Sequence, residues 1–296
     1  MKLSDTQFES LYEAAMSAAR KAGEHIQRKV GEHRETNRKE GGSSLASQVV
    51  TEVDLESQEI VLDCLSSSVE EYSLGILTEE SEDDSSRLNS DYFWCIDPLD
   101  GTLPFVEGTP GYSVSISLVD RSGIPVIGVV YDPAGNEMFH AASGIGSFRE
   151  NVSIADPGEL GGGTELSWFM DRSMKSVPEY EKVVADMEEL AVATGHSGLR
   201  IVDHAGAALN GVWVASQSPA IYFKLPKAKK GGGSFWDFAA SACFVSEWGR
   251  PPADIHGDLL DLNRPGSTFM NEKGVLYSSH AELSDAIIKW YRDGYS

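Results

Sequence analysis

The chain has 296 residues, of which 41% are hydrophobic and 24% charged, enough for one large globular unit or two packed domains with a real core. Its 46 Asp and Glu residues outnumber its 24 Lys and Arg residues, which gives a formal net charge of −22. Such a surface repels nucleic acids and anionic membranes, so we expect no nucleic-acid polymer and no membrane among its partners. A small phosphorylated metabolite is compatible with this charge, because a bound metal ion can reverse the local field.

The remaining composition indicates a cytoplasmic protein. No apolar run approaches the ~20 residues of a membrane span, and the N-terminal stretch MKLSDTQFES lacks the apolar core of a signal peptide. Cys64, Cys95 and Cys243 lie in apolar contexts without paired spacing, which is typical of buried, reduced thiols.

The first part of the chain predicts helices separated by a loop and a short strand. Apolar residues recur at helical spacing over residues 4–30. Residues 31–47 are polar and contain Gly and Ser, so they predict a loop, and residues 48–51 predict a short strand. A second helix is expected over residues 54–65, with Asp54 at its start.

A series of strands is expected next. The apolar stretch 69–77 leads to Glu79-Glu80, and the acidic, serine-rich segment 81–91 predicts a solvated loop. Beyond it, alternating or continuous apolar runs predict strands at 93–96, 112–119, 126–131, 138–140 and 146–149.

A break in the pattern divides the chain. Pro157 and the three glycines 161–163 indicate a linker, after which strands and helices alternate again. We therefore predict two α/β halves, residues 1–160 and 161–296, that meet at a cleft. The expected strands of the second half are 166–170, 199–202, 221–225 and 274–277, and its expected helices are 178–193, 205–215, 236–248 and 282–291.

The most informative segment follows the strand predicted at 93–96 and reads Asp97-Pro98-Leu99-Asp100-Gly101-Thr102. It places two carboxylates at the end of a buried strand. Two like charges 4 Å apart repel by roughly 4 kcal/mol at an effective dielectric constant near 20. A divalent metal between them is the simplest remedy. The alternative is a strand that ends in an acidic type I turn, with Pro98 at its second position.

Three further acidic positions lie at predicted element ends. Each has a structural alternative: Asp54 can cap its helix, Asp237 can be a first-turn acid favoured by the helix dipole, and Glu79 with Glu80 can be solvated loop acids. Taken singly, none of these positions decides between a metal site and a structural role.

Together, these residues resemble the spaced signature of the inositol monophosphatase-like superfamily of metal-dependent, lithium-sensitive phosphatases. The resemblance covers most of the chain. It implies an α/β (α+β) fold, a five-layer αβαβα sandwich of the inositol monophosphatase and fructose-1,6-bisphosphatase type, with the metal site between its halves. The matching positions, in order, are Asp54, Glu79-Glu80, the segment from Asp97 to Thr102, Trp236-Asp237 and Gly249.

The resemblance also implies roles for these residues. Two or three Mg²⁺ ions would be held by oxygen ligands and would position the attacking water and the leaving group. The first ion would take Glu79, Asp97 and the Leu99 carbonyl, and the second would take Asp97, Asp100 and Asp237. Thr102, supported by Asp54, would polarise the water, and Glu79 belongs to the same catalytic set. The backbone amides of Gly101 and Thr102 would bind the phosphate.

The substrate is predicted from one departure. Lys224 stands where inositol monophosphatases carry an acidic, sugar-binding residue, and a cation there suits a second phosphate. Ala207 lies in a segment that resembles the family's substrate-facing helix, and Asp237 also faces the substrate. We therefore expect a 3′(2′),5′-bisphosphate nucleotidase, acting as a monomer or homodimer. The alternatives are an inositol-1-phosphate or sugar-phosphate phosphatase and, from another class, a catalytically silent metal or nucleotide sensor. Lys227 and its neighbouring lysines in the glycine-containing loop 226–234 are expected to be solvated.

Overall fold

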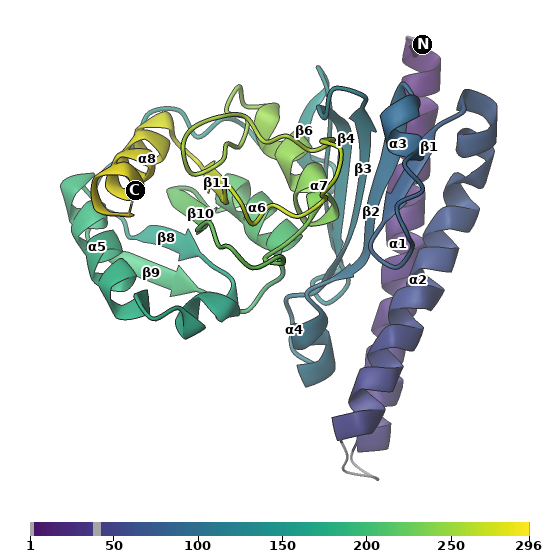
Figure 1. The fold of residues 1–296 in the computed structure, drawn as a ribbon, viewed down its shortest axis with the longest axis horizontal. Helices are drawn as coiled ribbons and strands as arrows, with labels where there is room; N and C mark the ends of the chain where they lie inside the picture. Colours follow the sequence, from purple (N-terminus) through teal and green to yellow (C-terminus); the bar gives the residue numbers. More distant parts are fainter. Residues whose placement is uncertain (1–2, 38–42, 296) are drawn as a thin grey trace.

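Five alternating layers of helices and sheets make up the fold (Figure 1). The computed structural model describes the backbone of residues 3–37 and 43–295, and the side chains of residues 3–30 and 52–294. The αβαβα sandwich expected from the sequence is confirmed. Within the described residues, every helix is too short or too polar to cross a lipid bilayer.

The first layer consists of two long antiparallel helices, α1 (Asp5–Asn37) and α2 (Ser43–Tyr72). Small residues on α1 let it approach the neighbouring sheet closely: a Cβ on Gly23 would lie 2.2 Å from the ring of Tyr131. The predicted loop at 31–47 and strand at 48–51 are wrong, because residues 31–37 and 43–51 are helical, and residues 38–42 lie outside the described part. The β-branched run at 49–51 is a weak local preference, which the helical apolar pattern of the following residues overrides.

The second layer is a seven-stranded sheet in the order β1 to β7. Only β1 and β2 run parallel; the other neighbours are antiparallel. Helices cover both faces, so the central strands are buried almost throughout. The strands are β1 (Gly75–Thr78), β2 (Tyr92–Asp100), β3 (Ser113–Asp120), β4 (Pro125–Asp132), β5 (Glu137–Ala142), β6 (Gly146–Arg149) and β7 (Val152–Ser153).

The loop predicted at 81–91 contains the short helix α3 (Ser86–Asn89) and is only partly solvated. Arg87 is buried there, because it pairs with Asp83 at 2.8 Å and donates a 2.7 Å hydrogen bond to Asn263. Such long-range partners are invisible in a local pattern of acidic and serine residues.

The middle layer is the pair α6 (Ala207–Ser216) and α7 (Phe235–Ser246). Both helices are rich in small residues, and their contacts are correspondingly close. A Cβ on Gly128 would lie 2.2 Å from the Ala240 carbonyl oxygen, and one on Gly211 would lie 2.6 Å from the Ser241 Cβ. The α7 helix thus packs directly on the first sheet although it belongs to the second half of the chain.

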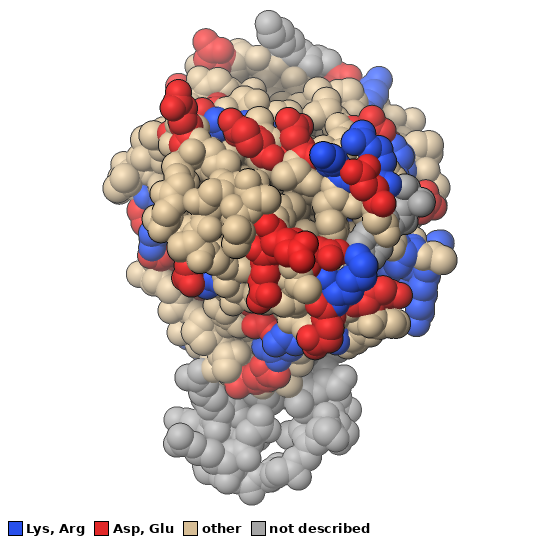
Figure 2. All heavy atoms as spheres, turned by 90° about the vertical axis from the view of Figure 1, so that its left-hand side faces the viewer, with Lys and Arg blue, Asp and Glu red and all other residues tan. Residues whose placement is uncertain are grey.

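The last two layers are a four-stranded sheet, in the order β11-β10-β8-β9, and the outer helices (Figure 1). Neighbouring strands are parallel except β10 and β11. The sheet comprises β8 (Leu166–Phe169), β9 (Leu199–Val202), β10 (Ala220–Lys224) and β11 (Val275–Ser278); the helical elements are η1 (Arg172–Ser176), α5 (Tyr180–Ala193) and α8 (Ala281–Tyr295). Figure 2 views the molecule from this side and shows acidic side chains across the middle of the face, with basic ones grouped toward one edge.

The division into halves at residues 1–160 and 161–296 stays a proposal. One continuous apolar core joins the inner face of the first sheet, α6, α7 and the second sheet. The end of β2 and the starts of α6 and α7 meet beside this core, and the acidic residues of the sequence signature lie there.

Candidate active site

Three carboxylates from distant parts of the chain converge at this junction. Asp97 and Asp100 come from the end of β2, and Asp237 comes from the first turn of α7. One carboxylate oxygen from each lies within 4.8 Å of the others, and Asp97 and Asp100 are only 1% and 5% exposed. Asp237 is far from Asp97 and Asp100 in the sequence, and it reaches them because α7 packs across the first sheet.

The end of β2 is shaped to present both of its carboxylates. Its pairing with β3 shifts register between Asp97 and Asp100, and the Leu99 N–H donates to Asp97 Oδ1 at 3.1 Å. Gly101 then turns the chain into α4 (Thr102–Glu107) with a φ of 84°. Only glycine fits this position, since a Cβ would lie 2.5 Å from the Gly111 carbonyl oxygen.

Asp100 is also bound to the start of α6. Its carboxylate accepts the N–H groups of Ala207 and Ala208 at 3.1 and 2.9 Å, an arrangement favoured by the positive end of the helix dipole. A Cβ on Gly206 would lie 2.3 Å from Asp100, so this approach requires glycine. Ala207 therefore lies at this junction, with its N–H already donated to a carboxylate.

Asp237 is both a first-turn residue of α7 and a member of the acidic cluster, the two alternatives considered from the sequence. It forms a capping box with Ser234, whose N–H donates to Asp237 Oδ2 at 2.6 Å. The same side chain faces Asp97 and Asp100. The loop before α7 is thereby tied directly to the acidic cluster.

Glu79 and Asp54 lie beside the cluster. The Glu79 N–H donates to the Ile96 carbonyl at 3.2 Å, and its carboxyl group shares a hydrogen bond with Asp97. Asp54 is inside α2, so the prediction that it opens a helix is wrong. Thr102 is exposed at the start of α4, and among the described side chains no hydrogen bond joins it to Asp54.

The crowding of carboxylates raises their pKa values. Burial, followed by the charge of Glu80, raises the pKa of Asp54 to about 7. Burial, followed by the charge of Asp237, raises the pKa of Glu79 to about 7. Burial and then the neighbouring carboxylates, Glu79 first, raise the pKa of Asp97 well above its ordinary value. A bound cation would stabilise the deprotonated carboxylates and so lower these pKa values again.

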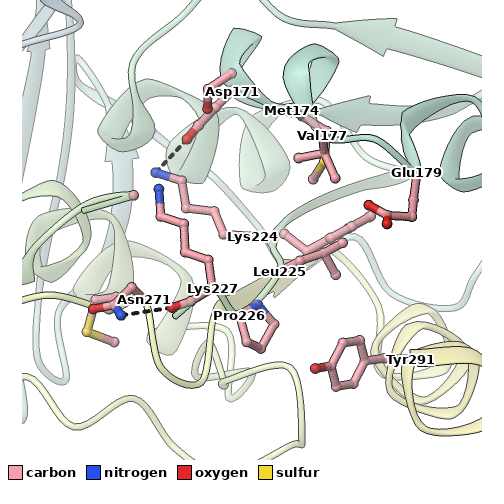
Figure 3. A pocket seen from close by; sticks show the side chains of 14 residues that line it. Asp171, Met174, Val177, Glu179, Lys224, Leu225, Pro226, Lys227, Asn271 and Tyr291 are labelled. Atoms are coloured by element: carbon pink, nitrogen blue, oxygen red, sulfur yellow. Dashed lines mark hydrogen bonds and ion pairs between the residues drawn. The ribbon is translucent and has the colours of Figure 1, made fainter. Parts of the chain in front are cut away.

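Two cavities meet beside the cluster. The first has a volume of about 250 Å³ and is lined by Gly101, Thr102, Ala207 and Asp237, among others. The second, shown in Figure 3, has a volume of about 420 Å³. The two share the residues Asp171, Ser173 and Lys224, so Lys224 belongs to the wall of both cavities.

Lys224 is largely buried and forms an ion pair. Its side chain is 15% exposed, and its ammonium lies 2.5 Å from Asp171 Oδ2 (Figure 3). Tyr222, two residues earlier on β10, donates a 2.9 Å hydrogen bond to Asp171 Oδ1. Burial alone would lower the pKa of Lys224, but the charges of Asp171, Asp237 and Asp100 raise it.

Asp171 was not predicted from the sequence. A signal was present: Asp171 follows the apolar strand β8, which runs parallel to β10, and the carboxyl ends of parallel strands meet at one edge of a sheet. The pairing of β8 with β10 could not be derived from either segment alone.

The model of the inositol monophosphatase family matches residues 7–293. The chain belongs to this family. It is 30% identical over 280 residues to the Nus factor SuhB of Escherichia coli K12, covering 92% of this chain and 97% of that protein. It is 27% identical over 256 residues to an inositol-1-monophosphatase of Synechocystis, covering 83% and 80%.

The fold is shared with solved structures of the family. CysQ from Bacteroides thetaiotaomicron, described as a bacterial member of the inositol monophosphatase family, superposes with a TM-score of 0.71 at 22% identity, covering 92% of this chain and 98% of that one. Inositol monophosphatase II of Staphylococcus aureus gives a TM-score of 0.72 at 20% identity, covering 96% and 98%.

Members of this family are metal-dependent phosphatases, and this chain is one of them. The residues present fit a metal. The cluster is made only of carboxylate oxygens, which suit hard divalent cations. Their raised pKa values follow from burial among other carboxylates, a concentration of negative charge that a divalent cation would neutralise.

Proposed function

We propose that this chain is a Mg²⁺-dependent 3′(2′),5′-bisphosphate nucleotidase, which converts adenosine 3′,5′-bisphosphate to AMP and phosphate. The observation that carries the proposal is the position of Lys224. Lys224 belongs to the wall common to the two cavities, and its ammonium is attracted by the charges of Asp100 and Asp237. A substrate whose hydrolysed phosphate binds at the acidic cluster would therefore place a second phosphate within reach of the Lys224 ammonium.

The acidic residues would hold two or three Mg²⁺ ions, which neutralise phosphate charge and make water a better nucleophile. The proposed ligands are Glu79, Asp97, the Leu99 carbonyl, Asp100 and Asp237.

The other residues act on substrate and water. Thr102 would orient the attacking water in line with the phosphorus–oxygen bond that breaks, and Asp54 would accept the proton of that water. Gly101 and Thr102 line the cavity where the phosphate binds. Hydrolysis transfers the phosphoryl group to water and leaves the nucleoside hydroxyl as the leaving group.

One observation favours a second candidate, inositol-1-phosphate hydrolysis. Asp171 places a carboxylate beside Lys224, and a carboxylate accepts hydrogen bonds from sugar hydroxyls. Asp171 could in this way replace the acidic residue that Lys224 displaces.

Phosphate release from adenosine 3′,5′-bisphosphate, inositol 1-phosphate and fructose 1,6-bisphosphate, each with and without Mg²⁺, separates the candidates. We expect the highest kcat/KM for the adenosine bisphosphate. A preference for inositol 1-phosphate would support the second candidate. Absence of metal-dependent turnover on all three would favour a silent metal or nucleotide sensor and refute the proposal.

A further inference from the structure

The Lys224 ammonium is attracted by two separate sets of carboxylates. It pairs with Asp171, and it is also attracted by the charges of Asp237 and Asp100, two members of the acidic cluster. Its charge in turn favours the ionised forms of Asp100 and Asp237, against the effect of burial. A lysine carries its charge at the end of a flexible chain. Unless it is held elsewhere, this ammonium therefore competes with a metal ion for the cluster.

The ion pair with Asp171 holds Lys224 in one position. The side chains of Lys224 and Asp171 are 15% and 23% exposed, so water screens their attraction less than it screens a surface pair. The ammonium also lies 5.1 Å from the centroid of the Phe238 ring, and a Cβ on Gly233 would lie 3.2 Å from Lys224 Nζ. Together these contacts keep the ammonium beside Asp171, as Figure 3 shows.

Asp171 is itself fixed by a buried tyrosine. The Tyr222 hydroxyl donates to Asp171 Oδ1 at 2.9 Å, and Oδ2 faces Lys224. Tyr222 is fully buried and lies two residues before Lys224 on β10, so the two side chains extend from the same face of that strand. Asp171 directly precedes η1, but within this fully described helix its carboxylate makes no capping hydrogen bond. The carboxylate serves two residues of β10 instead.

The surrounding charges draw Lys224 toward the acidic cluster. Glu179 and Lys227, both exposed and of opposite sign, also line the second cavity. Burial opposes the charged form of Lys224, whereas the charge of Asp171, then that of Asp237 and then that of Asp100 raise its pKa. Without the charge of Asp171, the attraction of the acidic cluster would therefore act on the ammonium unopposed.

We propose that Asp171, held by Tyr222, is a positioning residue that keeps the Lys224 ammonium out of the acidic cluster. The ion pair leaves the carboxylates of the cluster available to a divalent cation. It also keeps the ammonium on the wall common to the two cavities, where the second phosphate is proposed to bind. The inference rests on the metal role proposed for the cluster, but not on which phosphate ester is hydrolysed.

The test is the binding of Mg²⁺ alone to the metal-free protein, measured by titration calorimetry. Asp171→Asn removes the charge but keeps an oxygen that accepts from Tyr222. We expect the Kd for Mg²⁺ to rise about ten-fold, which is within the range of coupling between neighbouring charged groups. Tyr222→Phe releases Asp171 without changing any charge, and it should raise the Kd in the same direction by a smaller factor.

Two matched controls separate this role from simpler effects. Asp203→Asn removes the same charge from the wall of the first cavity, where Asp203 is 27% exposed and pairs with Lys175 of η1. It reports the general loss of negative charge and should change the Kd much less than Asp171→Asn. Tyr277→Phe removes a buried phenol directly opposite Tyr222 in the sheet, where the hydroxyl donates to a backbone carbonyl of α7. It should leave the Kd unchanged.

A double variant shows whether Asp171 acts through Lys224. In a Lys224→Gln background no ammonium can enter the cluster, so Asp171→Asn should raise the Kd for Mg²⁺ no more than Asp203→Asn does. Equal effects of Asp171→Asn in both backgrounds would overturn the positioning role and leave the metal site standing. An effect of Asp203→Asn as large as that of Asp171→Asn would do the same. Absence of Mg²⁺ binding by the wild type would refute the metal role and this inference together.

Discussion

Replacing Asp97 by Asn should stabilise the metal-free protein while abolishing most of its phosphatase activity. Asp97 is buried, hydrogen-bonded to Glu79, and within 4.8 Å of two further carboxylates. The Asn side chain can keep both local hydrogen bonds, because its oxygen still accepts from the Leu99 N–H and its amide can donate to Glu79. Only the negative charge is removed.

The size of the effect follows from the separation of the charges. Two unit charges 4.8 Å apart repel by roughly 3.5 kcal/mol at an effective dielectric constant near 20. We take the value for one pair as the size of the effect, because the wild-type cluster can take up a proton instead of bearing the full repulsion of both neighbours. At about 2 °C per kcal/mol for a chain of this size, the melting temperature should rise by up to about 7 °C.

The assay is thermal unfolding in a chelator at pH 8 and pH 5, with Asp285→Asn, an exposed position on α8, as the matched control. The gain from Asp97→Asn should shrink at pH 5, where the wild-type side chain is protonated in the fold at little cost. Adding Mg²⁺ should raise the melting temperature of the wild type more than that of the variant. A variant less stable than the wild type at pH 8, or a gain equal at both pH values, would refute the reasoning.

Three further predictions concern pH, lithium and Lys224. Because the pKa values of Asp54 and Glu79 rise from 3.8 and 4.5 to about 7 on folding, the folded chain binds more protons than the unfolded chain between these values. The metal-free protein should therefore lose stability as pH rises from about 4 to 7, and Mg²⁺ should raise the melting temperature more at pH 8 than at pH 5; an equal rise would contradict this. Millimolar lithium should lower turnover in saturating Mg²⁺, as the family resemblance implies, and unchanged turnover in a lithium titration would argue against that mechanism. Lys224→Gln should lower the preference for bisphosphates over inositol 1-phosphate about ten- to hundred-fold in kcat/KM. It is a cleaner test than Lys224→Glu, which would add a negative charge beside Asp100 and Asp237. An unchanged ratio would show that Lys224 serves only as the ion-pair partner of Asp171.

Much of the fold followed from local patterns. The strand before Asp97, the strands β3 to β6 and the alternation in the second half were predicted close to their observed bounds, because apolar periodicity reports which faces of a segment are buried. The apolar stretch 69–77 was not resolved correctly, since residues 69–72 end α2 and only 75–78 form β1, and β7 was not predicted. The same patterns failed over residues 31–37 and 43–51, where the polar composition and β-branched residues suggested a loop and a strand, yet the chain is helical. A weak local preference does not survive in a segment that continues a packed helix.

The sequence by itself determined the acidic signature, its order and therefore the family, because the residue types that bind hard cations are recognisable without coordinates. Only the tertiary structure decided which side chains meet. It joins Asp237 to Asp97 by packing α7 on the first sheet, and it joins Asp171 to Lys224 by pairing β8 with β10. Contacts of this kind depend on which surfaces pack together, and a local pattern describes a surface but not its partner.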